Sequence, residues 1–199
     1  MEKHPDLDKS VRYLAWLSLD SEAGQEYWLS MELAGKFASA NHYIIHKRVA
    51  AAVGLKEVAV VENHHNFAWN ETLPDGRNVI VHRKGATPAG EGVLGIIPGS
   101  MGDAGYLVRG KGVSSSLSSA SHGAGRRMSR TVAINSISRS TRDDYLKERG
   151  VTLIGGGIDE SPQAYKQIEE VIAAQNDLVE VLGKFSPRIV RMADEPGDI

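Results

Sequence analysis

The residues of this sequence that are best suited to chemistry are histidines, glycines and arginines gathered in short motifs. The densest motif is SHGAGRRMSR (residues 121–130), in which His122 precedes two glycines and three arginines. A neutral imidazole can attack phosphorus, and nearby guanidinium groups can stabilise the charge that develops on phosphoryl oxygens. The motif indicates phosphoryl transfer through His122, and a loop histidine whose hydrogen bonds are satisfied locally is the structural alternative.

A second motif, NHHNF (residues 63–67), carries two adjacent histidines after a predicted strand. Imidazole is a ligand for manganese, zinc or iron. Successive side chains on an extended segment point to opposite faces, so we expect at most one of the two histidines to face a given site. Polar packing without any metal is the alternative interpretation of the pair.

Two further segments, HRKGAT and IPGSMG (residues 82–87 and 97–102), combine glycines with polar or charged residues. Gly99 and Gly102 free the backbone, so that successive N–H groups can turn inward and bind an anion, and Ser100 adds a hydroxyl donor. The spacing of a Walker A loop is absent from these segments. A purely structural turn explains the glycines equally well.

Charge is distributed unevenly along the chain. Residues 77–130 hold eight Lys or Arg and two acids, whereas residues 143–199 hold twelve acids and six Lys or Arg. A local basic segment suits phosphate, and Arg83 and Lys84 place two of its charges beside a glycine-rich loop. A solvated basic face is the alternative.

The overall composition is that of an ordinary globular protein with 199 residues and a formal charge of −2. The chain has no cysteine, which excludes disulfides and thiolate metal sites. It also lacks an apolar run of 18 residues and an apolar signal-peptide core, so we expect a cytoplasmic protein without a membrane partner. The length predicts a single domain over residues 1–199, with a flexible tail at 193–199.

The elements that must position these motifs can be read from periodicity and turn residues. Residues 20–53 predict a long helix with one buried apolar face, which includes Tyr27, Phe37 and Ile45. Residues 57–62 predict a strand, and a turn at 74–77 leads into another strand at 78–83.

Farther along the chain, residues 85–125 contain eleven of the 21 glycines, which favours short strands joined by tight loops. Helices are predicted at 140–149 and at 162–183. The resulting fold class is α+β, with a mixed, mostly antiparallel sheet of short strands and long helices packed outside.

Taken in order, NHHNF, VHRKGAT, IPGSMG, SHGAGRRMSR and SPQAYK closely resemble the motifs of the RtcB family of RNA ligases, over residues 12–192. The resemblance implies a GTP- and Mn²⁺-dependent enzyme. Such an enzyme joins RNA ends with a 3′-phosphate or 2′,3′-cyclic phosphate to 5′-hydroxyl ends, in tRNA splicing or RNA repair, through a guanylylated histidine. The nucleophile position is His122, and His65 matches a manganese ligand. The matching nucleotide contacts are Asn66, Pro98, Gly99, Ser100, Met101, Gly123, Ala124, Gly125 and Tyr165. The side chains expected to hold RNA or phosphate are Lys84, Arg126 and Arg130.

The sequence also departs from the family pattern. Family members are about twice as long, and their N-terminal half supplies the other metal ligands. A serine of the family aligns with Gly105, and a guanylate-binding lysine aligns near Met192. Three hypotheses therefore stay open. In the first, the chain is one part of a split ligase that needs a separate N-terminal half or self-association. In the second, it is a non-catalytic remnant that binds nucleotide or RNA. In the third, it is a different phosphoryl-transfer enzyme with a histidine intermediate.

Overall fold

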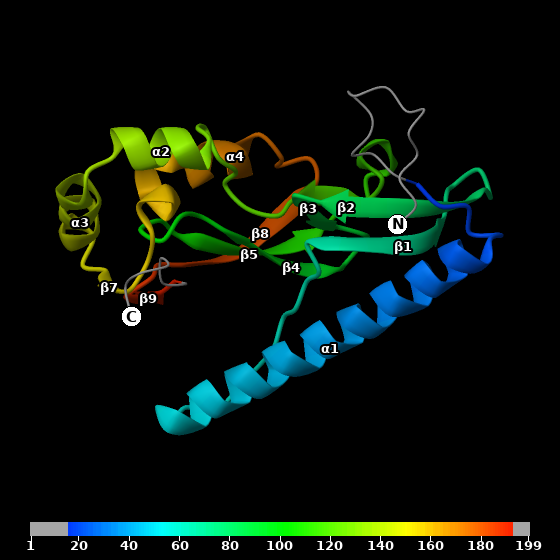
Figure 1. The fold of residues 1–199 in the computed structure, drawn as a ribbon, viewed down its shortest axis with the longest axis horizontal. Coiled ribbons are helices and arrows are strands. Elements are labelled where there is room, and N and C mark those ends of the chain that lie inside the picture. The colour runs from blue at the N-terminus through cyan, green and yellow to red at the C-terminus, as the bar shows by residue number, and fades with distance from the viewer. Residues whose placement is uncertain (1–15, 193–199) are drawn as a thin grey trace. The chain divides into compact units, whose positions relative to one another are not determined.

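The computed structural model describes residues 16–192, which fall into two compact units that divide after residue 58 (Figure 1). The first unit contains helix α1 (Glu22–Ala52), and the second contains every strand of the described part together with its shorter helices. The expectation of a single domain stays a prediction. The tail expected to be flexible, residues 193–199, lies outside the described residues.

Helix α1 confirms the long helix expected near residues 20–53. The Ser21 hydroxyl caps its first turn by accepting a hydrogen bond from the Gly24 N–H at 3.1 Å, and Gly54 follows its end with φ +70°. The expected burial of one face is wrong. Tyr27 is 58% exposed and Phe37 72% exposed, because no other described element of the same unit covers them. Despite its length, neither α1 nor any other described helix is apolar enough to cross a membrane.

The second unit is built from short strands and short helices. In chain order the strands are β1 (Asn66–Thr72), β2 (Asn78–Lys84), β3 (Ala86–Pro88), β4 (Leu94–Pro98), β5 (Gly105–Gly110), β6 (Ser119–Ser121), β7 (Thr152–Ile154), β8 (Val179–Phe185) and β9 (Ile189–Arg191). The α-helices are α2 (Arg130–Ser136), α3 (Arg139–Glu148) and α4 (Ile168–Ala173). Three 3₁₀ turns are η1 (Ser114–Ser116), η2 (Ile158–Glu160) and η3 (Pro162–Ala164).

Pairing among these strands is almost entirely antiparallel. The hairpin β1–β2 stands beside a sheet of order β4-β5-β8 and a short pair β3–β6, and only β7–β9 is parallel (Figure 1). Ile97, Val108 and Val179, one from each strand of the three-stranded sheet, lie in the main core with Ile168 of α4. The α+β class with short antiparallel strands is therefore confirmed.

Two predicted elements are wrong. Residues 57–62 form no strand, and the hairpin strand β1 begins at Asn66 instead. The helix predicted over 162–183 is a 3₁₀ turn, the six-residue α4 and strand β8. Val179 is buried and pairs with Gly110 of β5, so sheet pairing overrides the helical pattern of this segment.

Candidate functional site

Backbone hydrogen bonds bring the motifs NHHNF, VHRKGAT and SHGAGRRMSR together in the second unit. The Gly85 N–H donates to the His65 carbonyl at 3.2 Å, and the Gly85 carbonyl accepts from the His122 N–H at 3.4 Å. Gly85 has φ +76°, which an L side chain rarely adopts, and a Cβ added to it would lie 3.8 Å from the His122 ring. One glycine therefore joins the two histidine motifs and lets the ring approach the backbone closely.

The remaining two motifs join through the segment after His122. The Ala124 N–H donates to the Pro98 carbonyl at 3.0 Å, which connects this segment to the loop that follows β4. The Gly125 carbonyl accepts from the Lys166 N–H at 3.0 Å, which connects it to SPQAYK. Motifs spread over about a hundred residues of sequence thus meet at one place in the fold.

The two histidines of NHHNF point in different directions. The His65 ring stacks on His122, with centroids 5.6 Å apart and planes inclined by 20°. The His64 ring stacks on Phe67 at 5.1 Å. The expectation that only one histidine of the pair faces a given site is confirmed, and that histidine is His65.

His122 presents its two ring nitrogens differently. Nδ1 is buried and has no hydrogen-bond partner among the described residues, so this is not a loop histidine satisfied by its surroundings. Because Nδ1 is inaccessible, Nε2 is the nitrogen that a ligand can reach. With the ring proton on Nδ1, the lone pair of a neutral imidazole is on Nε2, as nucleophilic attack requires.

The loop IPGSMG does not form the anion nest that its glycines indicated. The Gly99 N–H donates to the Ala104 carbonyl at 2.9 Å, and the Gly102 N–H lies 3.3 Å from the Ser100 hydroxyl. The Ser100 hydroxyl itself donates to the Asp103 carboxylate at 2.5 Å. The donors therefore close the turn and are not available to an anion in this conformation.

A pocket of about 280 Å³ opens beside this loop. Its lining is mostly apolar, with carboxylates of Asp103 and Glu160. Four lining residues belong to the predicted nucleotide loop, and Tyr165 contributes an aromatic ring. The other lining residues are Gly105, Phe185, Pro187, Val190 and Met192.

Tyr165 is held by two opposite charges. Its hydroxyl donates to the Glu160 carboxylate and accepts from Arg126 Nη1 at 3.2 Å. Burial raises the pKa of Tyr165, and the Glu160 carboxylate raises the pKa further, so the phenol stays neutral and can donate. Arg126 also lies over the ring, 5.1 Å from its centroid.

The cations expected to hold phosphate differ in what they already bind. Arg126 lies 3.6 Å from Glu160, and Arg130 forms ion pairs with Asp159 and Glu160. These carboxylates raise the pKa of Arg130. Lys84 is exposed at the first pair of the β1–β2 ladder, directly opposite the equally exposed Asn66.

Arg83, the neighbour of Lys84, is a structural residue. It is 3% exposed and donates to both carboxylate oxygens of Glu71, at 2.6 and 3.0 Å. It also donates to the Ser119 hydroxyl at 2.7 Å and the Leu117 carbonyl at 2.8 Å, so its charge does not face a ligand. Buried guanidinium groups are stable only when paired in this way.

The metal expected at His65 does not fit the described residues alone. Within residues 16–192, no group of three or more His, Cys, Asp or Glu side chains lies close enough to hold a metal ion. Protein metal sites usually have three or more protein ligands. His65 can supply one imidazole, and the other ligands would have to come from outside the described part.

The roles of three residues around the site were not predicted from the sequence. Asn63 accepts from the Ile96 N–H at 2.9 Å and donates to the Leu94 carbonyl at 3.2 Å, which ties NHHNF to β4. Glu160 directly precedes SPQAYK and binds Tyr165, and Phe185 closes the pocket from β8. The adjacency of Glu160 to a motif was a usable signal, whereas Phe185 lies just beyond a segment predicted as helix.

Comparison with known proteins identifies the family of this chain. The model of the family described as tRNA-splicing ligase RtcB matches residues 1–193. The RNA-splicing ligase RtcB1 of Escherichia coli is 38% identical over 188 residues, which cover 86% of this chain and 44% of that protein. The tRNA-splicing ligase RtcB of Nanoarchaeum equitans is 34% identical over 221 residues, covering 94% and 46%. The RNA-splicing ligase RtcB of Mycobacterium bovis is 35% identical over 202 residues, covering 88% and 47%.

The chain therefore spans less than half the length of these relatives. The matched region contains all five motifs and both histidines of the stacked pair. On the family match and on these identities, the chain belongs to the RtcB family.

Proposed function

We propose that this chain is the nucleotide-accepting part of a GTP-dependent RNA ligase, in which His122 carries the guanylate. The observation that carries the proposal is the stacked pair of His65 and His122, held by Gly85 at the place where the five motifs meet. The buried Nδ1 of His122 supports the same role, because it leaves Nε2 as the reactive nitrogen. The names of the relatives, RNA-splicing and tRNA-splicing ligases, support RNA as the substrate.

In the proposed reaction, Nε2 of His122 attacks the α-phosphorus of GTP. A nitrogen–phosphorus bond forms, the bond to the bridging oxygen breaks and pyrophosphate leaves, while the ring keeps its proton on the buried Nδ1 as an imidazolium whose charge the anionic guanylate balances. GMP then passes to an RNA 3′-phosphate, and a 5′-hydroxyl attacks that activated end and releases GMP. The end chemistry and GTP are expectations from the family resemblance.

The pocket beside IPGSMG is the proposed site of the guanine base. Tyr165 and Phe185 offer aromatic faces for stacking, and the Glu160 and Asp103 carboxylates can accept hydrogen bonds from base N–H groups. Met192 lines this pocket where the resemblance places a lysine. The proposed site therefore binds the base mainly by stacking, with less positive charge than the family pattern has.

Manganese remains a proposal that needs a second polypeptide segment. His65 would be one ligand, and the rest would come from a metal-binding half, either on a separate chain or on a longer form of this one. The exposed apolar side chains of α1, such as Leu33 at 70% and Phe37 at 72%, support a protein surface that another segment covers.

A non-catalytic nucleotide- or RNA-binding module is the second candidate. It is favoured by the ion pairs of Arg126 and Arg130, because their charges are already neutralised by Glu160 and Asp159. Such a module would bind nucleotide without forming a covalent bond. The two candidates differ in one measurable property, the covalent label on His122.

The test is labelling with α-³²P-GTP and Mn²⁺. Three samples are compared: the chain alone, the chain mixed with the N-terminal half of a related ligase, and that mixture with His122→Ala. The matched control is His64→Ala, which removes an imidazole that stacks on Phe67 and not on His122. An acid-labile label that needs both halves and His122 supports the ligase. A folded chain that stays unlabelled in every mixture contradicts it and favours the binding module.

A further inference from the structure

A second, larger pocket lies between helix α3 and the parallel pair β7–β9. Its volume is about 790 Å³, and it shares no lining residue with the pocket beside IPGSMG. The two pockets are nevertheless neighbours, because Val190 and Met192 of the β9 region line the first pocket and Arg191 lines the second. Alternation along the extended chain accounts for this division, since successive side chains point to opposite sides.

The second pocket is lined by four cations and one acid. Arg139, Arg142 and Lys147 come from α3 and Arg191 from β9, whereas Asp143 is the acidic residue of the lining. On α3 the lining residues recur at intervals of three and four, so one face of the helix supplies them. This face therefore carries a net positive charge into a hollow of the surface.

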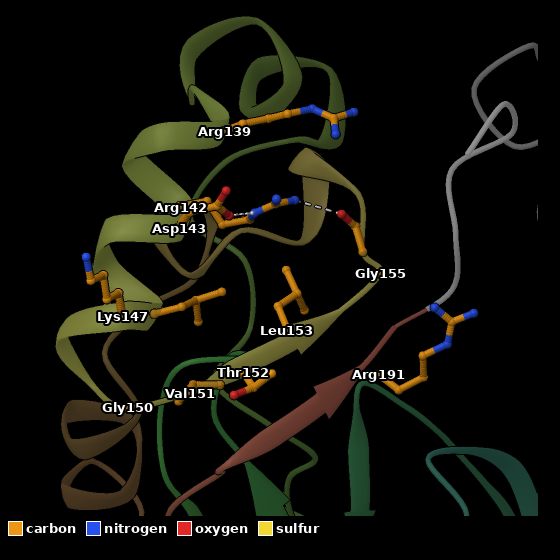
Figure 2. A pocket seen from close by; sticks show the side chains of 12 residues that line it. Arg139, Arg142, Asp143, Lys147, Gly150, Val151, Thr152, Leu153, Gly155 and Arg191 are labelled. Carbon is orange, nitrogen blue, oxygen red and sulfur yellow. Dashed lines mark hydrogen bonds and ion pairs between the residues drawn. The ribbon is translucent and has the colours of Figure 1, made fainter. Parts of the chain in front are cut away.

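Arg142 forms the fixed part of this site. It is 7% exposed, and its Nη1 donates to the Gly156 carbonyl at 2.7 Å while its Nε donates to Asp143 at 2.8 Å (Figure 2). These bonds hold the guanidinium in the wall of the pocket and partly neutralise Asp143. The three other cations, Arg139, Lys147 and Arg191, are exposed, and Arg191 Nη1 also donates to the Ile154 carbonyl at 2.9 Å.

The spacing of the cations indicates an extended ligand. Arg139 and Lys147 are eight residues apart on one helix, which corresponds to about 12 Å along its axis. Figure 2 shows the cations spread around the pocket and not directed at one point. A single phosphate would need convergent donors, whereas a chain of phosphates presents negative charges at successive positions.

We propose that this pocket binds the phosphodiester backbone of single-stranded RNA, at a distance from the end that is joined. The inference rests on the proposed function, because that function makes RNA the substrate of the neighbouring site. Since the two pockets share no residue, RNA bound here would not displace nucleotide from the pocket beside Tyr165. Contacts of this kind position a substrate without reading its sequence.

The test compares two double variants of the full chain. Arg139→Ala with Lys147→Ala removes two charges from the pocket. The matched control, Arg77→Ala with Arg109→Ala, removes two exposed arginines that are paired with Asp75 and Glu180 outside it. Binding of a fluorescent 12-nucleotide RNA with a 5′-phosphate and 3′-hydroxyl, ends that the proposed ligation does not use, is measured by anisotropy at several salt concentrations.

The pocket variant should weaken RNA binding about tenfold or more at low salt. It should also reduce the slope of log K against log salt by about 1.4, which is about 0.7 for each phosphate that is no longer neutralised. The control variant should change neither quantity by a comparable amount. Restoring the charges with Arg139→Lys and Lys147→Arg should recover most of the binding. Equal effects of both double variants on RNA binding would overturn the proposal.

Competitors distinguish the sources of negative charge. Unlabelled RNA should displace the probe from the wild-type chain far better than inorganic tripolyphosphate or a twelve-residue polyglutamate. Equal displacement by polyglutamate would overturn RNA in favour of an acidic peptide, and tighter binding of tripolyphosphate would overturn it in favour of a small polyphosphate. Labelling of His122 with GTP is measured on the same variants. This measurement distinguishes a failure of RNA binding at the second pocket from a failure of the proposed ligase reaction.

Discussion

His65 and His122 lie face to face, with ring centroids 5.6 Å apart and planes inclined by 20°, although 56 residues separate them in the sequence. Gly85 holds both residues through its N–H and its carbonyl. The pairing leaves Nε2 of His122 as the accessible nitrogen and places a candidate metal ligand beside it. The first prediction separates these two contributions of His65.

Replacing His65 with Phe keeps an aromatic ring against His122 but removes both ring nitrogens. We expect the free energy of unfolding to change by less than about 1 kcal/mol, since the stacked contact is retained. Labelling of His122 in the two-part mixture should fall at least tenfold, because the substitution removes the proposed metal ligand. His64→Phe is the matched control, and unchanged labelling in His65→Phe would show that His65 only packs.

Gly105 is the position where the family resemblance places a serine. A Cβ at this position would lie 2.3 Å from Cζ of Phe185, so a side chain there requires the Phe185 ring to move. We expect Gly105→Ser to destabilise the chain by about 1–3 kcal/mol through overpacking. In the double variant Gly105→Ser with Phe185→Ala, the serine should fit into the space that the ring has left. Thermal unfolding of the double variant and of each single variant measures the coupling free energy between the two positions. Additive effects would mean that the two positions do not compete for space.

The parts of the fold that local chemistry dictates were predictable. Helix α1 follows from its apolar period and its Ser21 cap, and the β1–β2 turn follows from its Pro-Asp-Gly sequence, in which Gly76 has φ +86°. Strand β8 was not predictable, because Val179 and its neighbours satisfy a helical pattern and become a strand only by pairing with β5. That pairing joins residues about seventy positions apart, which no local pattern records.

In the site, too, the residue types were predictable from the sequence, whereas the pairing of distant side chains was not. The motifs containing His122 and His65 were identified from residue types, and the structure brings the two histidines together. The roles of the charged side chains could not be predicted from the sequence. Arg83 and Lys84 are adjacent in the sequence, but their side chains point to opposite faces of β2. Glu71 and Glu160, which neutralise Arg83 and Arg126, lie too far along the chain for their pairing to be inferred.

Arg83 and Lys84 should therefore differ sharply under mutation. Arg83→Ala should reduce the free energy of unfolding by about 3 kcal/mol, because it leaves the Glu71 carboxylate without its buried partner. Lys84→Ala should leave stability within about 0.5 kcal/mol and reduce guanylate labelling, since Lys84 is exposed beside Asn66. Denaturant unfolding and labelling on both variants check this, and a large loss of stability in Lys84→Ala would contradict the assignment.

The raised pKa of Tyr145 predicts how the free energy of unfolding depends on pH in the alkaline range. Its hydroxyl donates to the Asp103 carboxylate at 2.7 Å, and burial, followed by that carboxylate, raises the pKa of Tyr145 from 10.0 to about 12. Below pH 10 the phenol is protonated in both states, so its full contribution is present. Between pH 10 and about 12 the unfolded chain loses this proton first, and stability falls as pH rises.

Tyr145→Phe removes the hydroxyl and with it this dependence. At pH 8 we expect the variant to be less stable than the wild type by about 1 kcal/mol, the typical net value of one hydrogen bond. The gap should shrink as pH rises from 10 toward about 12, because the unfolded wild-type chain releases the Tyr145 proton in this range and the variant has no such proton to release. Urea unfolding at pH 8, 10 and 11 measures the difference, with Tyr27→Phe on α1 as the exposed control. A gap that stays constant from pH 8 to 11 would show that burial and the Asp103 carboxylate do not raise the pKa of the Tyr145 hydroxyl.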